Sequence, residues 1–166
     1  AVYIAQSSPA REIAGAGIRI YLRAGEFPAL ALGDMVTARG WMRSFRGERE
    51  LVLDSPSQLA LTGPGAVPRP LLVDPAQVGE ALEGRLVELE GTLVLRDGDS
   101  LYLAGERGVP VRVMVARSLG WGLPETRVGE RWRVVGVVGQ LARATPWNGG
   151  YRILVRFAQD LVRVGG

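Results

Sequence analysis

One nine-residue pattern occurs twice in this chain, and its repetition limits the fold more than any other feature of the sequence. Residues 32–40 read Leu-Gly-Asp-Met-Val-Thr-Ala-Arg-Gly, and residues 128–136 read Val-Gly-Glu-Arg-Trp-Arg-Val-Val-Gly. Each copy is an apolar residue, a glycine, an acid, five residues and a second glycine, and the copies lie 96 residues apart. This order is typical of a tight turn that leads into a strand. The repetition indicates two copies of one structural unit.

Three further segments repeat in the same order around this pattern. Residues 1–5 match 100–104, residues 17–23 match 111–117, and residues 47–59 match 149–161. The separation between copies stays between 93 and 102 residues, and small insertions in loops explain this drift. The sequence therefore predicts two domains, at 1–61 and 81–166. Between them, residues 62–80 contain four prolines and are expected to form a stiff, extended linker.

Alternation of apolar and polar residues predicts strands on both sides of that linker. The first unit has strands at 1–6, 17–23, 34–42 and 49–54, and the second at 82–95, 100–104, 109–117, 130–139 and 150–158, with a short last segment at 161–164. Five strands with a long first strand and a connection between the third and fourth are the pattern of the OB-fold barrel. We therefore predict an all-β chain of two tandem five-stranded barrels, the first of which lacks its N-terminal strand. The missing strand leaves an unpaired edge, and Leu71-Leu72-Val73 is a candidate to fill it.

Several apolar residues are expected in the barrel cores. Trp132 aligns with Val36 and is expected in the core, whereas Trp121 is expected to plug the bottom of the second barrel and Trp41 fits either environment. In the long strand at 82–95, Gly91 predicts a bulge. The inward residues of that strand are expected to be Leu86, Val87 or Leu89, Leu93 and Leu95.

The composition excludes most catalytic and metal sites. The chain has no cysteine and no histidine, and all 20 of its basic residues are arginine. Thiolate and Ser/His/Asp chemistry are therefore unavailable, and so are the usual zinc ligands. No apolar run approaches the roughly 20 residues that a membrane-spanning helix needs. We expect no catalytic residue, no metal, no cofactor and no membrane insertion.

The repeated segments resemble tandem OB-fold nucleic-acid-binding domains of bacterial proteins. The resemblance covers nearly the whole chain outside the linker and implies a non-catalytic accessory module, with neighbouring domains in a larger protein that is secreted or on the cell surface rather than cytoplasmic. Its residues are Val2-Tyr3-Ile4, Gly17 to Tyr21, Leu32 to Val36, Gly40 and Glu50 to Leu53 in the first unit, and Glu83 to Val87, Gly91, Leu101-Tyr102-Leu103, Val128-Gly129-Glu130 and Gly136 in the second.

OB-folds bind their ligands on the face of strands two and three and on the adjoining loops. Single strands are held there by aromatic side chains that stack on bases and by cations that contact phosphates. The same residue types also suit a solvated strand surface, and Phe45 or Trp147 equally suits packing over a barrel end. The predicted nucleic-acid-binding residues are Tyr3, Arg19, Tyr21, Arg23, Arg43, Phe45, Arg46 and Arg49 in the first unit, and Tyr102, Arg112, Arg143, Trp147 and Asn148 in the second.

The sequence favours a module that binds single-stranded nucleic acid, with DNA preferred over RNA. Guanidinium groups bind phosphate bidentately and stack on bases, although a net charge of +3 is too small to identify such a partner alone. A structural or protein-interaction spacer in a larger exported protein is the alternative. Oligosaccharide binding is a third reading, which the fold permits.

Overall fold

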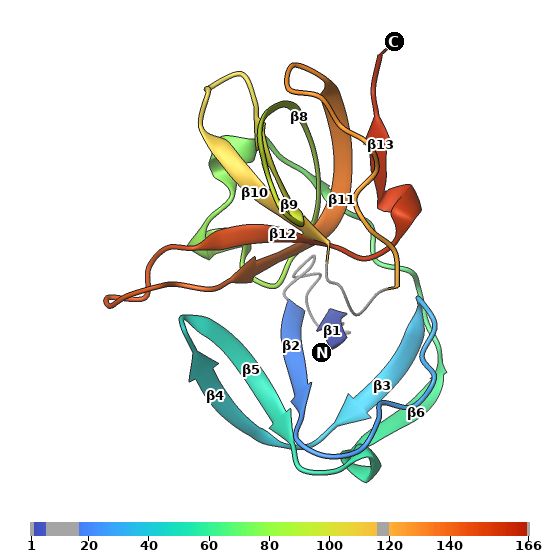
Figure 1. The fold of residues 1–166 in the computed structure, drawn as a ribbon. Coiled ribbons are helices and arrows are strands. Elements are labelled where there is room, and N and C mark those ends of the chain that lie inside the picture. Colours follow the sequence, from blue (N-terminus) through green and yellow to red (C-terminus); the bar gives the residue numbers. More distant parts are fainter. Residues whose placement is uncertain (1, 6–16, 116–119, 166) are drawn as a thin grey trace.

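The computed structural model describes residues 2–5, 17–115 and 120–165, and these residues form an all-β structure (Figure 1). Strands β1 to β6 make up the first half of the molecule, and strands β7 to β13 make up the second half. Short 3-10 helices connect some strands, at Pro56–Gln58 (η1), Pro75–Gln77 (η2), Glu80–Leu82 (η3) and Ala158–Asp160 (η5). Within the described ranges, no helix is both long and apolar enough to span a bilayer.

The second half contains a closed five-stranded barrel. Strand β8 pairs with β9, β9 with β10, β10 with β12, β12 with β11, and β11 closes the ring by pairing with β8. The β10–β12 pairing is parallel and the other four are antiparallel. Two short strands, β7 and β13, add to the outside of β8 and β11. The bounds are β7 (Leu71–Leu72), β8 (Leu86–Asp97), β9 (Ser100–Ala104), β10 (Pro110–Val115), β11 (Arg131–Gln140), β12 (Tyr151–Val155) and β13 (Leu161–Arg163).

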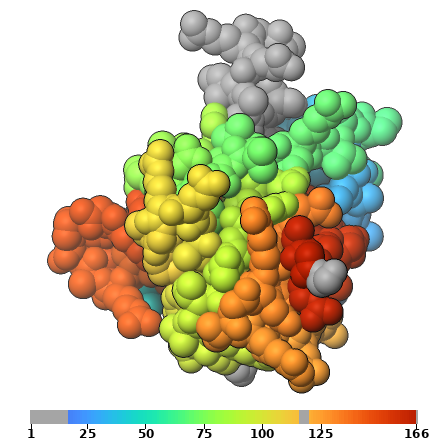
Figure 2. All heavy atoms as spheres, turned by 90° about the horizontal axis from the view of Figure 1, so that it is seen from above, coloured from blue at the N-terminus to red at the C-terminus, as the bar shows by residue number. Residues whose placement is uncertain are grey.

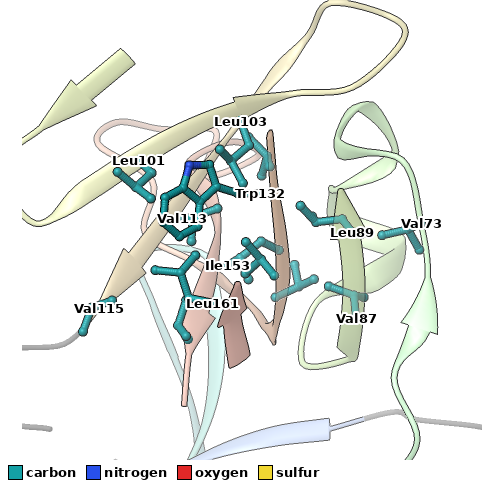
Figure 3. Packing of buried hydrophobic residues seen from close by; sticks show 14 of the residues in the cluster. Val73, Val87, Leu89, Leu101, Leu103, Val113, Val115, Trp132, Ile153 and Leu161 are labelled. Carbon is teal, nitrogen blue, oxygen red and sulfur yellow. The ribbon is translucent and has the colours of Figure 1, made fainter. Parts of the chain in front are cut away.

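Sixteen buried residues of the described chain fill this barrel, and Trp132 lies among them as predicted (Figure 3). Trp121 is partly buried and packs against the same cluster. On β8, Val87, Leu89 and Leu93 point inward because alternate residues of a strand share a face.

The prediction for Leu95 was wrong, since its side chain is 51% exposed. The register of β8 against β9 shifts between Leu93 and Leu95, and this shift moves Leu95 out of the inward frame. The irregularity therefore follows Leu93 and does not coincide with Gly91, where the sequence placed the bulge. Gly91 itself is buried in close contact with β9: a side chain there would meet the backbone of Ala104 and the Cβ of Leu103.

The first half is open in the described residues. Its strands form a four-stranded sheet in the order β1-β2-β5-β4 and a separate pair of β3 with β6. Only three residues, Ile20, Leu53 and Leu59, form its buried cluster. The bounds are β1 (Val2–Ala5), β2 (Gly17–Leu22), β3 (Asp34–Ala38), β4 (Trp41–Phe45), β5 (Glu48–Leu53) and β6 (Leu59–Pro64).

Two strand predictions for the first half need correction. The strand expected at 34–42 is two strands, β3 and β4, separated by Arg39 and Gly40. Residues 43–48, which lie between the strands expected at 34–42 and 49–54, belong mostly to β4 and β5, and the turn consists of Arg46 and Gly47, both with positive φ. Such turns match the twist of the flanking strands, so β4 extends through Phe45 and takes Arg43 with it.

The structure explains why both copies of the repeated pattern begin with a glycine and an acid. Gly33 and Gly129 have φ of +91° and +96°, a region that other residues rarely adopt. The acid that follows each glycine closes the same turn: the amide of Ala31 donates to Asp34 Oδ2 at 2.6 Å, and the amide of Arg127 donates to Glu130 Oε2 at 2.9 Å. The backbone amide from Arg127 is also the main reason that the pKa of Glu130 is lowered.

The glycine that ends each copy also has a shared physical cause. A Cβ on Gly40 would overlap the carbonyl oxygen of Val52, and a Cβ on Gly136 would meet the carbonyl oxygen of Leu154. In both cases the neighbouring strand of the hairpin passes too close for a side chain. The repeated pattern is therefore a turn followed by a strand, and its last glycine allows the partner strand to approach closely.

The strand registers of the two halves correspond residue by residue. Tyr3 pairs with Arg19 as Tyr102 pairs with Arg112. Likewise, Trp41 pairs with Val52 as Val137 pairs with Leu154. These pairings match Gly17–Leu22 to Pro110–Val115, so the sequence match of 17–23 to 111–117 was one residue out of step. A one-residue step reverses the faces of a strand, and the register shows which faces are equivalent.

The linker is more structured than the sequence indicated. Part of it, β6, pairs with β3, and Leu71–Leu72 pairs in parallel with β8. The latter contact contradicts the proposal that residues 71–73 complete the first half, because they pair with β8 of the second barrel instead. Val73 also joins the core of that barrel.

Candidate nucleic-acid interface

A groove of about 440 Å³ lies on the second half, between the β9–β10 face and the loop that joins β11 to β12. Its lining contains three arginines and two tyrosines, and no aspartate or glutamate is among these described residues. The lining residues are Tyr102, Pro110, Arg112, Leu141, Ala142, Arg143, Ala144, Thr145, Pro146, Asn148, Gly149, Gly150, Tyr151 and Arg152. We call this site the arginine groove.

Two of the three arginines are neighbours across a strand pair. Arg112 on β10 lies opposite Arg152 on β12 in the parallel register. Arg112 Nε donates to Ser100 Oγ at 3.0 Å, and Arg152 Nη1 lies 3.7 Å from Met114 Sδ. Like charges directly opposite each other destabilise a sheet. An anion bound between these guanidinium groups would remove that repulsion.

The loop at 141–150 forms one wall of the arginine groove and projects from the side of the molecule (Figure 2). Gln140 anchors it, since its Nε2 donates to the Trp147 carbonyl at 2.8 Å and to Tyr151 Oη at 3.1 Å. Tyr151 in turn donates to Glu80 Oε2 at 2.5 Å. Burial and this bond to Glu80 raise the pKa of Tyr151 to about 12. The wall is therefore held by side-chain hydrogen bonds as well as by the strands.

On the corresponding face of the first half, arginines form ion pairs with buried glutamates. Glu48 and Glu50 are each only 1% exposed. Arg19 Nη1 lies 2.8 Å from Glu48 Oε2 and 2.7 Å from Glu50 Oε1, and Arg43 Nη2 lies 2.5 Å from Glu50 Oε2. Removal of Arg19 would take a cationic partner from both buried carboxylates. This cluster holds the sheet together, and its cations are engaged internally.

Aromatic and guanidinium groups alternate at the outer side of that cluster. The guanidinium carbon of Arg43 lies 4.9 Å from the Tyr21 ring centre and 5.5 Å from the Phe45 ring centre. The guanidinium carbon of Arg46 lies 5.7 Å from the Phe45 ring centre. Both rings remain more than one third exposed. Stacking of this kind stabilises the row and presents two aromatic surfaces to solvent.

The two halves touch where these features meet. The amide of Ala142 donates to the Arg46 carbonyl at 2.9 Å, so the β4–β5 turn lies beside the wall of the arginine groove. Gly47 packs so closely on the Gln140 amide that a Cβ there would overlap it. The backbone amide of Arg49 also donates to Glu83 Oε1 at 2.9 Å. Tyr21, Arg43, Phe45 and Arg46 form what we call the aromatic row. The aromatic row thus adjoins the arginine groove, although the two are far apart in the sequence.

The predicted residues fall into three groups. The arginine groove brings together Tyr102, Arg112, Arg143 and Asn148, and the row on the first half brings together Tyr21, Arg43, Phe45 and Arg46. Arg19 belongs to the buried ion cluster, Arg23 pairs with Asp54 at 3.0 Å, Arg49 is exposed at the junction, and Trp147 is exposed but does not line the groove. Tyr3 lies on β1 opposite Arg19, and its side chain is outside the described part of the structure.

Sequence reasoning missed four residues that shape the site. Glu48 and Glu50 stand two residues apart on one strand, and this spacing places both carboxylates on the face that carries Arg19. Tyr151 and Arg152 belong to a correctly expected strand and directly precede its apolar residues Ile153 to Val155. Only the pairing of β12 with β10 shows that Arg152 lies beside Arg112.

The described residues contain no group of three or more His, Cys, Asp or Glu side chains that could hold a metal ion. The chain matches no protein-family model, and no curated protein matches it at a significant level.

Proposed function

We propose that this protein is a non-catalytic module that binds single-stranded nucleic acid, DNA in preference to RNA, with the phosphates in the arginine groove. One observation supports the proposal above the others: three arginines line a groove without a lining carboxylate. Guanidinium groups contact phosphate with two donors at once. Tyr102 and Tyr151 in the same lining supply rings of the kind on which bases stack.

The contrast between the halves supports the choice of the second half for the phosphates. Arg19 is matched by Arg112 in the strand register, and Glu50 is matched by Arg152. The first face therefore carries an internal ion pair where the second carries two cations. A polyanion is attracted to a face on which arginines are grouped.

The aromatic row extends the proposed path onto the first half. Tyr21 and Phe45 are exposed there, and the turn after Phe45 touches the wall of the groove at Ala142. Each base that stacks on an aromatic side chain contributes about 1–3 kcal/mol. We therefore expect the phosphates of one strand to lie mainly in the arginine groove while its other bases continue toward Phe45.

We further propose that the halves are two versions of one OB-fold barrel, the second closed and the first open. The equal strand registers and the shared turn chemistry support this layout. OB-folds bind along the face and loops that form the arginine groove here. The similarity of layout to OB-folds is an analogy, whereas the charge of the groove supports binding independently of that analogy.

Fluorescence anisotropy with labelled oligonucleotides tests the proposal. We expect a thymidine oligonucleotide of about 12 nucleotides, a length that an OB-fold site can hold, to bind at low salt and to bind more tightly than the matching uridine oligonucleotide. Arg143→Ala is the main variant, because Arg143 is exposed and its loss should leave the fold intact. It should weaken binding about fivefold and reduce the salt slope by about 0.7 per lost phosphate contact.

Arg69→Ala is the matched control, since Arg69 is an exposed arginine outside the groove. It should leave both the affinity and the salt slope unchanged. An absence of binding at low salt, or equal weakening by both substitutions, would contradict the proposal. Capture of a protein partner without any affinity for oligonucleotides would instead favour a protein-interaction spacer.

A further inference from the structure

The first half has an open edge where the second half has a strand. In the second half, β8 pairs with both β9 and β11 and closes the ring. The matching strands of the first half are β1 and β3–β4. In the described residues, β1 pairs only with β2, β3 only with β6, and β4 only with β5. The space between β1 and β3–β4 therefore corresponds to a single missing strand.

The second half shows how the backbone of that edge would be used. The amide of Leu93 donates to the Glu130 carbonyl at 2.8 Å, and the amide of Val138 donates to the Arg85 carbonyl at 2.9 Å. The positions that match Glu130 and Val138 are Asp34 and Met42. Their backbone groups therefore lie on the side that faces the missing strand. Unpaired groups along a sheet edge are a template for another strand.

The side chains at this edge are apolar and exposed. Trp41 is 45% exposed and Met42 is 57% exposed, although both belong to a strand of a folded sheet. Val138, which matches Met42 in the strand register, is fully buried in the core of the closed half. An extra strand on β3–β4 would cover the apolar surface that β8 covers in the second barrel.

The occupant's chemistry follows from β8. That strand runs antiparallel to β11 and directs Val87, Leu89 and Leu93 inward. Its alternate residues include Glu88 and Glu90, which are more accessible. A strand that fits the first half should have the same alternation and the same direction relative to β3–β4. A second copy of this chain would bring a whole sheet to a gap that is one strand wide.

We propose that the open edge of the first half is an acceptor for one extended polypeptide strand of the β8 type, which pairs antiparallel with β3–β4 and closes the half-barrel. This inference is separate from the nucleic-acid proposal, because the arginine groove lies on the second half. Binding by strand addition derives its affinity from main-chain hydrogen bonds and its specificity from alternate side chains.

A labelled synthetic peptide with the sequence of residues 83–97 tests the inference on the intact chain. We expect saturable binding of one peptide per chain in anisotropy titrations. A peptide of the same composition, in which each apolar residue is exchanged with its polar neighbour, should bind at least about tenfold more weakly, because its apolar face would point to solvent. Equal binding of the two peptides would overturn the proposal.

Met42→Pro is the decisive variant and Met42→Ala is its control. Proline removes the backbone donor at position 42 that faces the gap, and edge strands tolerate proline at such positions. We expect Met42→Pro to weaken peptide binding at least about tenfold and Met42→Ala to weaken it less than threefold.

Hydrogen exchange of the wild-type protein gives a readout that does not depend on a variant. Added peptide should slow amide exchange at residues 34–42 and leave residues 131–140 unchanged. Slowing confined to residues 131–140 would show exchange with β8 itself and would contradict the proposal. Dimerisation through the first half that the peptide does not displace would contradict it as well.

Discussion

The two halves of this protein have the same strand pairings but differ in closure. The second half joins β8 to β11 and has a core cluster of sixteen buried residues, whereas the core cluster of the first half consists, in the described residues, of Ile20, Leu53 and Leu59. Both have the same turn chemistry and the same register between matching strands. The comparison shows that pairing alone does not make a core, because a barrel excludes water only when its last strand closes the ring.

The halves also differ in charge on their equivalent faces. Arg19 faces Glu50 across β2 and β5, and Arg112 faces Arg152 across β10 and β12. One acid in place of an arginine thus separates a face with internal ion pairs from a face on which two arginines lie opposite each other. The predictions below test this contrast, from the largest expected effect to the smallest.

The largest effect should come from the closed core. Leu103→Ala should lower the free energy of unfolding by about 4 kcal/mol, because Leu103 is fully buried and its site cannot collapse. Leu59→Ala in the first half should cost only about 2 kcal/mol, since fewer buried neighbours surround it. Urea unfolding followed by tryptophan fluorescence measures both. Equal losses would show that the first half is as well packed as the second.

The buried ion cluster should give the next largest effect. Glu50→Gln should destabilise the protein by about 3 kcal/mol, because Arg19 and Arg43 would lose a buried partner. Oligonucleotide affinity should rise at the same time if the protein remains folded, since Arg43 loses this carboxylate while Arg19 keeps Glu48. The same unfolding and anisotropy titrations report both changes. A variant as stable as the wild type would show that the cluster is not structural.

A smaller effect is expected at the repeated turn. Gly129→Ala should cost about 1 kcal/mol, because φ is positive and no atom crowds the site. Gly33→Ala should cost more, since its Cβ would also lie 3.1 Å from the Gly65 carbonyl oxygen. Thermal unfolding of the two variants checks the order. A larger loss for Gly129→Ala would contradict the proposed equivalence of the turns.

The smallest effect concerns Tyr151 at alkaline pH. Its pKa is raised to about 12 from an ordinary value near 10. The unfolded chain therefore loses this proton first, so the stability that Tyr151 contributes is complete below pH 10 and is lost as the pH rises toward 12. Ultraviolet titration of the four tyrosines should show a late component that Tyr151→Phe removes. A single transition near pH 10 would contradict this.

The sequence predicted the local structure better than the pairings that bring distant strands together. Alternation identified the strands. The prediction that Trp132 lies in the core was also correct, because the face that it occupies depends on a single strand. Leu95 was wrong because a shift in the β8–β9 pairing changes its face. Residues 71–73 were wrongly placed because their partner is 15 or more positions away. No local pattern indicates such a pairing.

The same limit applies to the candidate site. Outward positions on strands identified Tyr102 and Arg112, and a loop position identified Arg143; the structure brings the three to one groove. The internal use of Arg19 and Arg43 could not be predicted, since it depends on β2 lying beside β5 and β4 beside β5. The contact of Arg46 with Ala142 depends on how the two halves meet.

Hydrogen exchange with and without a thymidine oligonucleotide tests the central claim most directly. The claim is that the closed, cationic half contacts the phosphates and that the neutralised face of the first half does not. We predict slower exchange at residues 99–115 and 140–152 when the oligonucleotide is bound, and no change at residues 17–20. Slowing centred on residues 17–20 and 48–50, with residues 140–152 unaffected, would contradict the account.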